Sequence, residues 1–172
     1  MFLRLATQTL CGAILGLILQ TPFILPTATA STRINLNGQW QFRTDAVNQG
    51  EQQGWTKQIP TETEIVRVPH TWGVGKHRDF EGTAWYFKTF ALPEDGLGKH
   101  LELHFGATFY KSRVWLNGVE LGAHEGGYTE YWFDVTPYTK NTNFVSVELN
   151  NQPGVSTIPG WAMKLHLSLI HI

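Results

Sequence analysis

The sequence predicts an all-β protein built as a sandwich or a barrel. Short segments alternate between apolar and polar residues, and glycine or proline recurs between them. No window of about a dozen residues repeats its apolar positions with a helical period. Strands separated by frequent turns are therefore the dominant pattern of the chain.

The first strand signals are aromatic and alternating segments in the middle of the chain. Residues 85–90 (WYFKTF) are rich in aromatic and β-forming residues. Residues 100–105 (HLELHF) alternate, with Leu101, Leu103 and Phe105 on one face and polar residues on the other. A period of two indicates a strand with one buried face.

A hairpin follows. Residues 112–116 (SRVWL) and 119–121 (VEL) flank Asn117-Gly118. Asn-Gly is the strongest short hairpin signal, because a type I′ turn requires two residues at positive φ. Residues 145–150 (VSVELN) form the last alternating segment.

The segments between these strands are predicted to be loops. Residues 51–64 are polar and irregular, which favours a surface loop. Residues 69–75 (PHTWGVG) and 152–160 (QPGVSTIPG) carry the proline and glycine typical of loops. Among the tryptophans, Trp40, Trp85 and Trp115 fall in strand-like segments, so we expect them in the core.

The first 30 residues are predicted to be a removable signal peptide. Arg4 supplies positive charge, residues 11–25 are mostly apolar, and Ala28-Thr29-Ala30 offers a small-x-small cleavage site. A membrane anchor is the alternative, but residues 20–22 interrupt an apolar run that would need about 20 residues. The pattern favours an exported protein, periplasmic or secreted, with no membrane contact after cleavage.

Composition excludes several classes of function. The net charge is −1 and no basic stripe occurs, so nucleic acid is not an expected partner. The only cysteine, Cys11, lies in the leader, so we expect no disulfide in the mature domain. His100 and His104 would lie about 13 Å apart along one strand face, too far to share an ion. The sequence therefore predicts no metal and no cofactor, and it contains no phosphate-binding or dinucleotide-binding fingerprint.

Several short motifs follow one another in a fixed order. They are residues 36–42 (LNGQWQF), 68–72 (VPHTW), 80–90 (FEGTAWYFKTF), 103–107 (LHFGA), 114–118 (VWLNG), 122–128 (GAHEGGY), 133–138 (FDVTPY) and Asn150-Asn151. Each is weak alone, but together and in this order they resemble the N-terminal sugar-binding domain of family 2 glycoside hydrolases, the β-galactosidase, β-glucuronidase and β-mannosidase group.

The resemblance implies a jelly-roll β-sandwich of the galactose-binding-domain type. In the family this domain precedes an immunoglobulin-like sandwich and a TIM barrel, which would be its partners in the intact protein. It implies retaining hydrolysis of terminal β-glycosides by two glutamates on the barrel. Those glutamates have no counterpart here, so we expect no catalytic residue in this chain, and a β-glycoside or oligosaccharide as ligand.

The chain also departs from the family pattern. Thr129-Glu130-Tyr131 stands where the family often has Thr-Pro-Phe, and the closing Gly-Gly-Ile-x-Arg strand is missing. The final hexapeptide, residues 167–172, resembles a translated library adapter. We therefore expect a leader over residues 1–30, an incomplete domain over 31–166 and a non-native tail over 167–172.

Six residues are candidates for contact with a sugar. Trp72 and Trp161 lie in loops beside glycine or proline and could stack on a pyranose ring. Asp79 and Glu81 lie in a polar loop, and the resemblance implies that a loop in this neighbourhood reaches the active site; a solvated loop is the alternative. His124 and Glu125 could line the rim of a sugar site, whereas the favoured interpretation is a structural turn around Gly126 and Gly127.

Three functions remain open at this point. The favoured one is a non-catalytic module of an exported family 2 hydrolase, inactive alone. The second is a free-standing carbohydrate-binding protein, and the third is a purely structural or adhesive sandwich. Asn150-Asn151 followed by residues 157–159 (TIP) leans toward the β-glucuronidase-like branch, with the β-galactosidase branch close behind.

Overall fold

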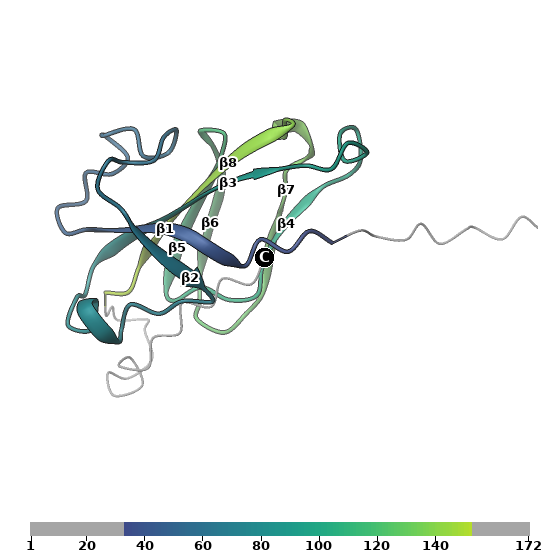
Figure 1. Cartoon of the computed structure of the whole chain (residues 1–172). Helices are drawn as coiled ribbons and strands as arrows, with labels where there is room; N and C mark the ends of the chain where they lie inside the picture. The colour runs from purple at the N-terminus through teal and green to yellow at the C-terminus, as the bar shows by residue number, and fades with distance from the viewer. Residues whose placement is uncertain (1–32, 153–172) are drawn as a thin grey trace, which may run out of the picture. The chain divides into compact units, whose positions relative to one another are not determined.

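A computed structural model describes residues 33–152, shown in Figure 1. The predicted leader, the predicted tail and Trp161 lie outside this part of the chain. The elements are β1 (Gly38–Asp45), β2 (Glu64–Val68), the 3-10 helix η1 (Gly75–His77), β3 (Thr83–Ala91), β4 (Glu102–Phe105), β5 (Lys111–Leu116), β6 (Val119–Glu125), β7 (Tyr131–Asp134), the 3-10 helix η2 (Thr136–Tyr138) and β8 (Thr142–Asn150).

The strands form two antiparallel sheets. The larger sheet has six strands in the order β2-β1-β3-β8-β5-β6, and the smaller sheet pairs β4 with β7. Strands that are distant in sequence, such as β3 and β8, are neighbours in the large sheet. The predicted all-β jelly-roll sandwich is confirmed, and each predicted strand lies within or overlaps an observed one.

The predicted hairpin joins β5 to β6. Asn117 and Gly118 have φ angles of 52° and 83°, the two positive values that a type I′ turn requires. The side chain of Asn117 also accepts the backbone N–H of Phe144 at 2.9 Å and donates to the carbonyl of Tyr138 at 2.8 Å. The asparagine thus fixes the turn against the start of β8.

The main core lies between the two sheets. Alternation along β3 and β4 directs Tyr86, Leu103 and Phe105 inward, where they join Phe42 from β1. Phe105 stacks on Tyr131 of β7, with ring centroids 4.8 Å apart. The core also takes in Trp40, which is buried as predicted and donates its indole N–H to the carbonyl of Leu36 at 2.8 Å.

The opposite face of the large sheet carries a second core. Trp85 and Trp115 are buried there, as expected, and their rings stack with centroids 5.1 Å apart. The segment 46–63 covers them and inserts Trp55, which is only 5% exposed. This corrects the expectation of a simple surface loop at residues 51–64. Most of its polar residues face solvent, but Thr56 is buried, Trp55 holds the segment on the sheet, and Glu64 already belongs to β2.

Within residues 33–152, no helix is long and apolar enough to cross a membrane.

Candidate functional site

Loops that carry the candidate residues meet at one end of the sandwich. Thr83 of β3 pairs with Asn150 of β8, Asn150 pairs with Lys111 of β5, and Lys111 pairs with Glu125 of β6. The loops 69–82, 106–110 and 126–130 adjoin these strand ends. We call these three loops the loop end. The loop 69–82 is attached to β3 and the loop 126–130 to β6. These two strands lie three strand spacings, or about 14 Å, apart in the large sheet.

Trp72 is a structural anchor of the loop 69–82. Its side chain is 1% exposed and packs against Phe42 and Tyr86, with ring centroids 5.9 and 6.2 Å away. Its indole N–H donates to the carbonyl of Phe80 at 3.3 Å. The hypothesis that Trp72 stacks on a sugar is therefore wrong, because both the ring and its N–H are used inside the fold.

Asp79 and Glu81 follow Trp72 in the same loop and face solvent. Asp79 contacts Arg78 at 3.3 Å, and the Asp79 side chain is 89% exposed. Exposed carboxylates accept hydrogen bonds from hydroxyl groups, which is the chemistry that a polyol ligand requires.

Asn151 fixes the base of this loop, and sequence reasoning missed this role. Its side chain accepts the backbone N–H of Gly82 at 2.8 Å and donates to the carbonyl of Phe80 at 3.3 Å. Its own backbone N–H donates to the carbonyl of Gly82 at 3.2 Å. Because Asn151 holds the residues on both sides of Glu81, it sets where that carboxylate projects. The Asn150-Asn151 pair was the available signal in the sequence.

The middle of the loop 69–82 is held by the first residue of β2. Glu64 accepts hydrogen bonds from Lys76 at 2.6 Å and from His77 at 3.0 Å. The hydrogen bond from Lys76, followed by that from His77, lowers the pKa of Glu64 below its ordinary value. His70 lies against the Tyr86 hydroxyl at 2.8 Å, and burial lowers the pKa of its imidazole.

His124 has the structural role that the sequence favoured. Its imidazole stacks on Tyr131 with ring centroids 4.1 Å apart, and Nε2 lies 3.2 Å from the Thr129 hydroxyl. Burial lowers the pKa of His124, which favours its neutral form. Gly126 has a φ of 150° and donates its N–H to the carbonyl of Tyr110 at 2.9 Å, so it shapes the turn.

Glu125 and Tyr128 are the accessible groups beside this turn. Glu125 lies 3.5 Å from Lys111, and about half of its side chain is exposed. The Tyr128 residue is 65% exposed. The structure thus brings Asp79 and Glu81 together in one loop and Glu125 into another at the same end of the sandwich. The strands that anchor these two loops lie about 14 Å apart, whereas the paired carboxylates of glycoside hydrolysis are 5 to 10 Å apart.

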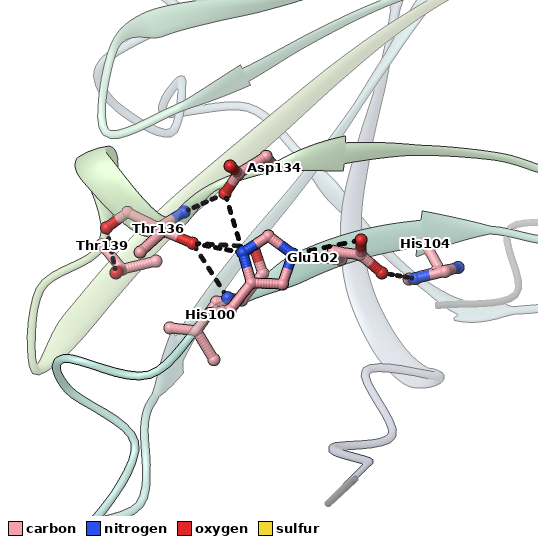
Figure 2. A network of polar contacts seen from close by, with 7 residues as sticks. His100, Glu102, His104, Asp134, Thr136 and Thr139 are labelled. Carbon is pink, nitrogen blue, oxygen red and sulfur yellow. Dashed lines mark hydrogen bonds and ion pairs between the residues drawn. The ribbon is translucent and has the colours of Figure 1, made fainter.

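A second polar cluster lies on the outer face of the small sheet. Figure 2 shows Glu102 between His100 and His104, with Asp134 and Thr136 on the other side of His100. Glu102 contacts Nε2 of His100 at 3.2 Å and Nε2 of His104 at 2.8 Å. The imidazole rings of His100 and His104 lie on either side of Glu102 in the sequence. Both side chains lean toward Glu102, so both rings contact its carboxylate (Figure 2).

The described residues contain no group of three or more histidine, cysteine or acidic side chains arranged to hold a metal ion.

Comparisons with known proteins agree with this architecture. Residues 34–158 match the family model described as glycosyl hydrolases family 2, sugar binding domain. A β-glucuronidase from Paenibacillus borealis is 30% identical over 148 residues, covering 82% of this chain and 25% of the relative. A β-galactosidase from Bacteroides ovatus is 28% identical over 135 residues, covering 69% of this chain and 15% of the relative.

Solved structures give the same result. The β-glucuronidase from Ruminococcus gnavus in complex with D-glucuronic acid superposes with a TM-score of 0.68 at 30% identity, covering 73% of this chain and 23% of that one. The chain thus spans about a quarter or less of the length of these relatives.

Proposed function

The chain belongs to the sugar-binding domain family of the family 2 glycosyl hydrolases, and from this membership we propose that it serves as the non-catalytic sugar-binding module of an exported, retaining β-glycosidase. The proposal assigns hydrolysis to carboxylates elsewhere in a longer protein. This chain would position the terminal sugar and form one side of its pocket.

The loop 69–82 is the observation that carries this proposal. It holds Asp79 and Glu81 in solvent while Asn151 and the indole of Trp72 fix its base. A loop that is rigid at its base and acidic at its tip can present hydrogen-bond acceptors to sugar hydroxyls without a large ordering cost on binding. Among residues 33–152, the ion pair of these exposed carboxylates is the contact of Asp79 with Arg78.

We propose a β-glucuronide as the first substrate class and a β-galactoside as the second. Relatives named β-glucuronidase support the first, as does the sequence pattern of Asn150-Asn151 followed by residues 157–159 (TIP). Asp79 and Glu81 would meet hydroxyl groups of the sugar, and the carboxylate of a glucuronide would be bound outside this loop. Relatives named β-galactosidase support the second.

Export is part of the same proposal. The apolar segment 11–25 and the Ala28-Thr29-Ala30 site support cleavage after Ala30. N-terminal sequencing of the protein recovered from culture fluid or periplasm tests it: a start at Ser31 is expected, and retention of Met1 would contradict it.

The hydrolase proposal is tested by expressing the complete reading frame of the gene beside the 172-residue chain. We expect the longer product to hydrolyse 4-nitrophenyl β-glucuronide or β-galactoside, and the shorter chain to hydrolyse neither. Asp79→Asn and Glu81→Gln in the longer product should raise KM roughly tenfold, as lost hydrogen bonds to a sugar do. Glu94→Gln, an exposed carboxylate beyond the other end of β3, is the matched control.

Hydrolysis by the shorter chain would contradict the assignment of catalysis to another part of the protein. A reading frame with no second domain and no activity, but with saturable sugar binding, would instead favour a free-standing carbohydrate-binding protein. Absence of both activity and binding would leave the structural sandwich as the function.

A further inference from the structure

The outer face of the small sheet presents an aromatic ring and several carboxylates to solvent. Alternation along β4 and β7 sends Leu103 and Tyr131 into the core and leaves Glu102, His104 and Trp132 outside. His104 and Trp132 are direct cross-strand partners, as are Glu102 and Asp134. The five outward side chains His100, Glu102, His104, Trp132 and Asp134 are called here the β4–β7 face.

Trp132 is the most unusual member of the β4–β7 face. It is 55% exposed, whereas the other described tryptophans, at positions 40, 55, 72, 85 and 115, are buried. An exposed indole leaves apolar surface in water and gains nothing from the core. Its ring stacks on His104 with centroids 5.7 Å apart and an angle of 18° between the planes. Because Trp132 is 55% exposed, a large part of its surface stays in solvent beside this stack.

The surroundings of Trp132 are held in a defined arrangement. Glu102 contacts His104 at 2.8 Å and His100 at 3.2 Å, so the imidazole that stacks on Trp132 is fixed in place (Figure 2). Asp134 accepts the backbone N–H of Thr136 at 2.9 Å, and more than half of its side chain remains exposed. A ring stacked on an ordered neighbour loses little conformational freedom when a ligand binds.

The charge of this surface selects the kind of ligand. Neither β4 (ELHF) nor β7 (YWFD) contains lysine or arginine, and Glu130 adds a further exposed carboxylate just before β7. An anionic ligand such as a uronate would be repelled by these groups. A neutral sugar would not, because its hydroxyl groups donate to carboxylates and its C–H face packs on an indole.

We propose that the β4–β7 face binds a neutral hexose-based oligosaccharide, with one pyranose ring stacked on Trp132 and its hydroxyls donating to Asp134 and Glu102. This site lies on a different surface from the acidic tip of the loop 69–82. This inference takes only the ligand class, a carbohydrate, from the proposed function, since binding at the β4–β7 face requires no catalytic domain.

The experiment titrates the whole 172-residue chain with oligosaccharides and follows tryptophan fluorescence. The probes are cellohexaose and mannohexaose, with hexagalacturonic acid as the charged comparison. Since Trp132 is the exposed indole among the described residues, stacking should shift its emission to shorter wavelength. We expect saturable binding of a neutral probe in the millimolar range or tighter, and affinity for the charged probe roughly tenfold lower or worse.

Variants assign the signal. Trp132→Ala should weaken binding of the neutral probe at least roughly tenfold, and Trp132→Phe should keep part of it, because a smaller aromatic face remains. Tyr128→Ala removes another exposed aromatic residue at the loop end and should leave binding unchanged. Asp79→Asn and Glu81→Gln should also leave it unchanged, which separates this site from the loop end.

Three outcomes would overturn the proposal: no saturable binding of any neutral probe, binding that Trp132→Ala does not weaken, or binding lost on changing Asp79 and Glu81 instead. A fourth outcome would be that no sugar binds and that Trp132→Ala lowers the stability of the longer gene product. That result would identify the β4–β7 face as a contact with another domain. A longer product that lacks glycosidase activity, while Trp132-dependent binding persists, would refute the proposed function and leave this inference standing.

Discussion

The carboxylate of Asp45 accepts a hydrogen bond from the indole N–H of Trp85 at 3.1 Å. Asp45 is the last residue of β1, and Trp85 lies in the middle of the second core. The same carboxylate accepts the backbone N–H groups of Gln49 at 3.0 Å and Gly50 at 2.8 Å. One buried side chain therefore ties the start of the segment 46–63 to the tryptophan that this segment covers. Gly50 leaves room for this arrangement, because a Cβ there would lie 2.6 Å from atoms of both Trp55 and Trp85.

Replacing Asp45 should destabilise the whole domain. Asp45→Ala leaves three donors without their acceptor, two of them in buried hydrogen bonds, at a cost of about 3 kcal/mol in the free energy of unfolding. Urea unfolding followed by tryptophan fluorescence measures this change. Asp79→Asn, at an exposed carboxylate, should shift stability by less than about 0.5 kcal/mol. Equal stability of the Asp45 variant and the parent would show that the segment 46–63 is held by Trp55 alone.

Trp72 should behave as a core residue in mutagenesis. Trp72→Ala removes a buried indole that packs on Phe42 and Tyr86, and it should cost about 3–5 kcal/mol. Trp72→Phe should recover most of this loss. Thermal unfolding with and without sugar distinguishes packing from ligand contact. If the alanine variant kept full stability and lost only sugar affinity, the buried role of Trp72 would be refuted.

Asn151 should control the order of the loop 69–82. Asn151→Ala removes an acceptor from Gly82 and a donor from Phe80, both near the buried start of β3, at a cost of about 2 kcal/mol. The backbone amide of Gly82 should then exchange with solvent faster, as measured by hydrogen–deuterium exchange. Asn141→Ala is the control, since Asn141 is an exposed asparagine at the far end of β8. Unchanged protection at Gly82 would show that Trp72 fixes the loop without Asn151.

The sequence predicted those parts of the fold that depend on local periodicity. Residues 100–105 and 145–150 alternate, and both contribute strands with the expected inward residues. Asn117-Gly118 forms the expected turn because positive φ at two successive residues is a local requirement.

Burial inside irregular segments could not be predicted in this way. Trp55 and Trp72 are surrounded in the sequence by polar or turn-forming residues, yet both side chains are buried in a core. Residues in a loop follow no regular period, so the sequence pattern does not predict which of them are buried. Trp132 is the reverse case: β7 spans only Tyr131–Asp134, too short for alternation to identify an outward tryptophan. The candidate loop residues Asp79 and Glu81 were predictable as exposed groups, but the clamp by Asn151 joins positions about 70 apart in the sequence and required the structure.

His70 should make the stability of the domain fall as the pH drops from neutral. Burial, followed by the nearby His77, lowers the pKa of His70 below its ordinary value of 6.5, with Glu64 acting in the opposite direction. The unfolded chain therefore takes up a proton at this residue at a higher pH than the folded chain does. Since stability rises with pH wherever the unfolded state binds more protons, the free energy of unfolding should decrease as the pH falls through 6.5 toward the lowered pKa.

His70→Gln tests this dependence, because glutamine can still bond to the Tyr86 hydroxyl without titrating. Urea unfolding between about pH 7 and pH 5, where most carboxylates stay ionised, should show a flatter stability profile for the variant than for the parent. Asn141→Ala, at an exposed residue that does not titrate, should leave the slope unchanged. If the two variants had the same pH profile, the burial of His70 would not be the source of the dependence, and another group, such as His124, whose pKa is also lowered by burial, would have to carry it.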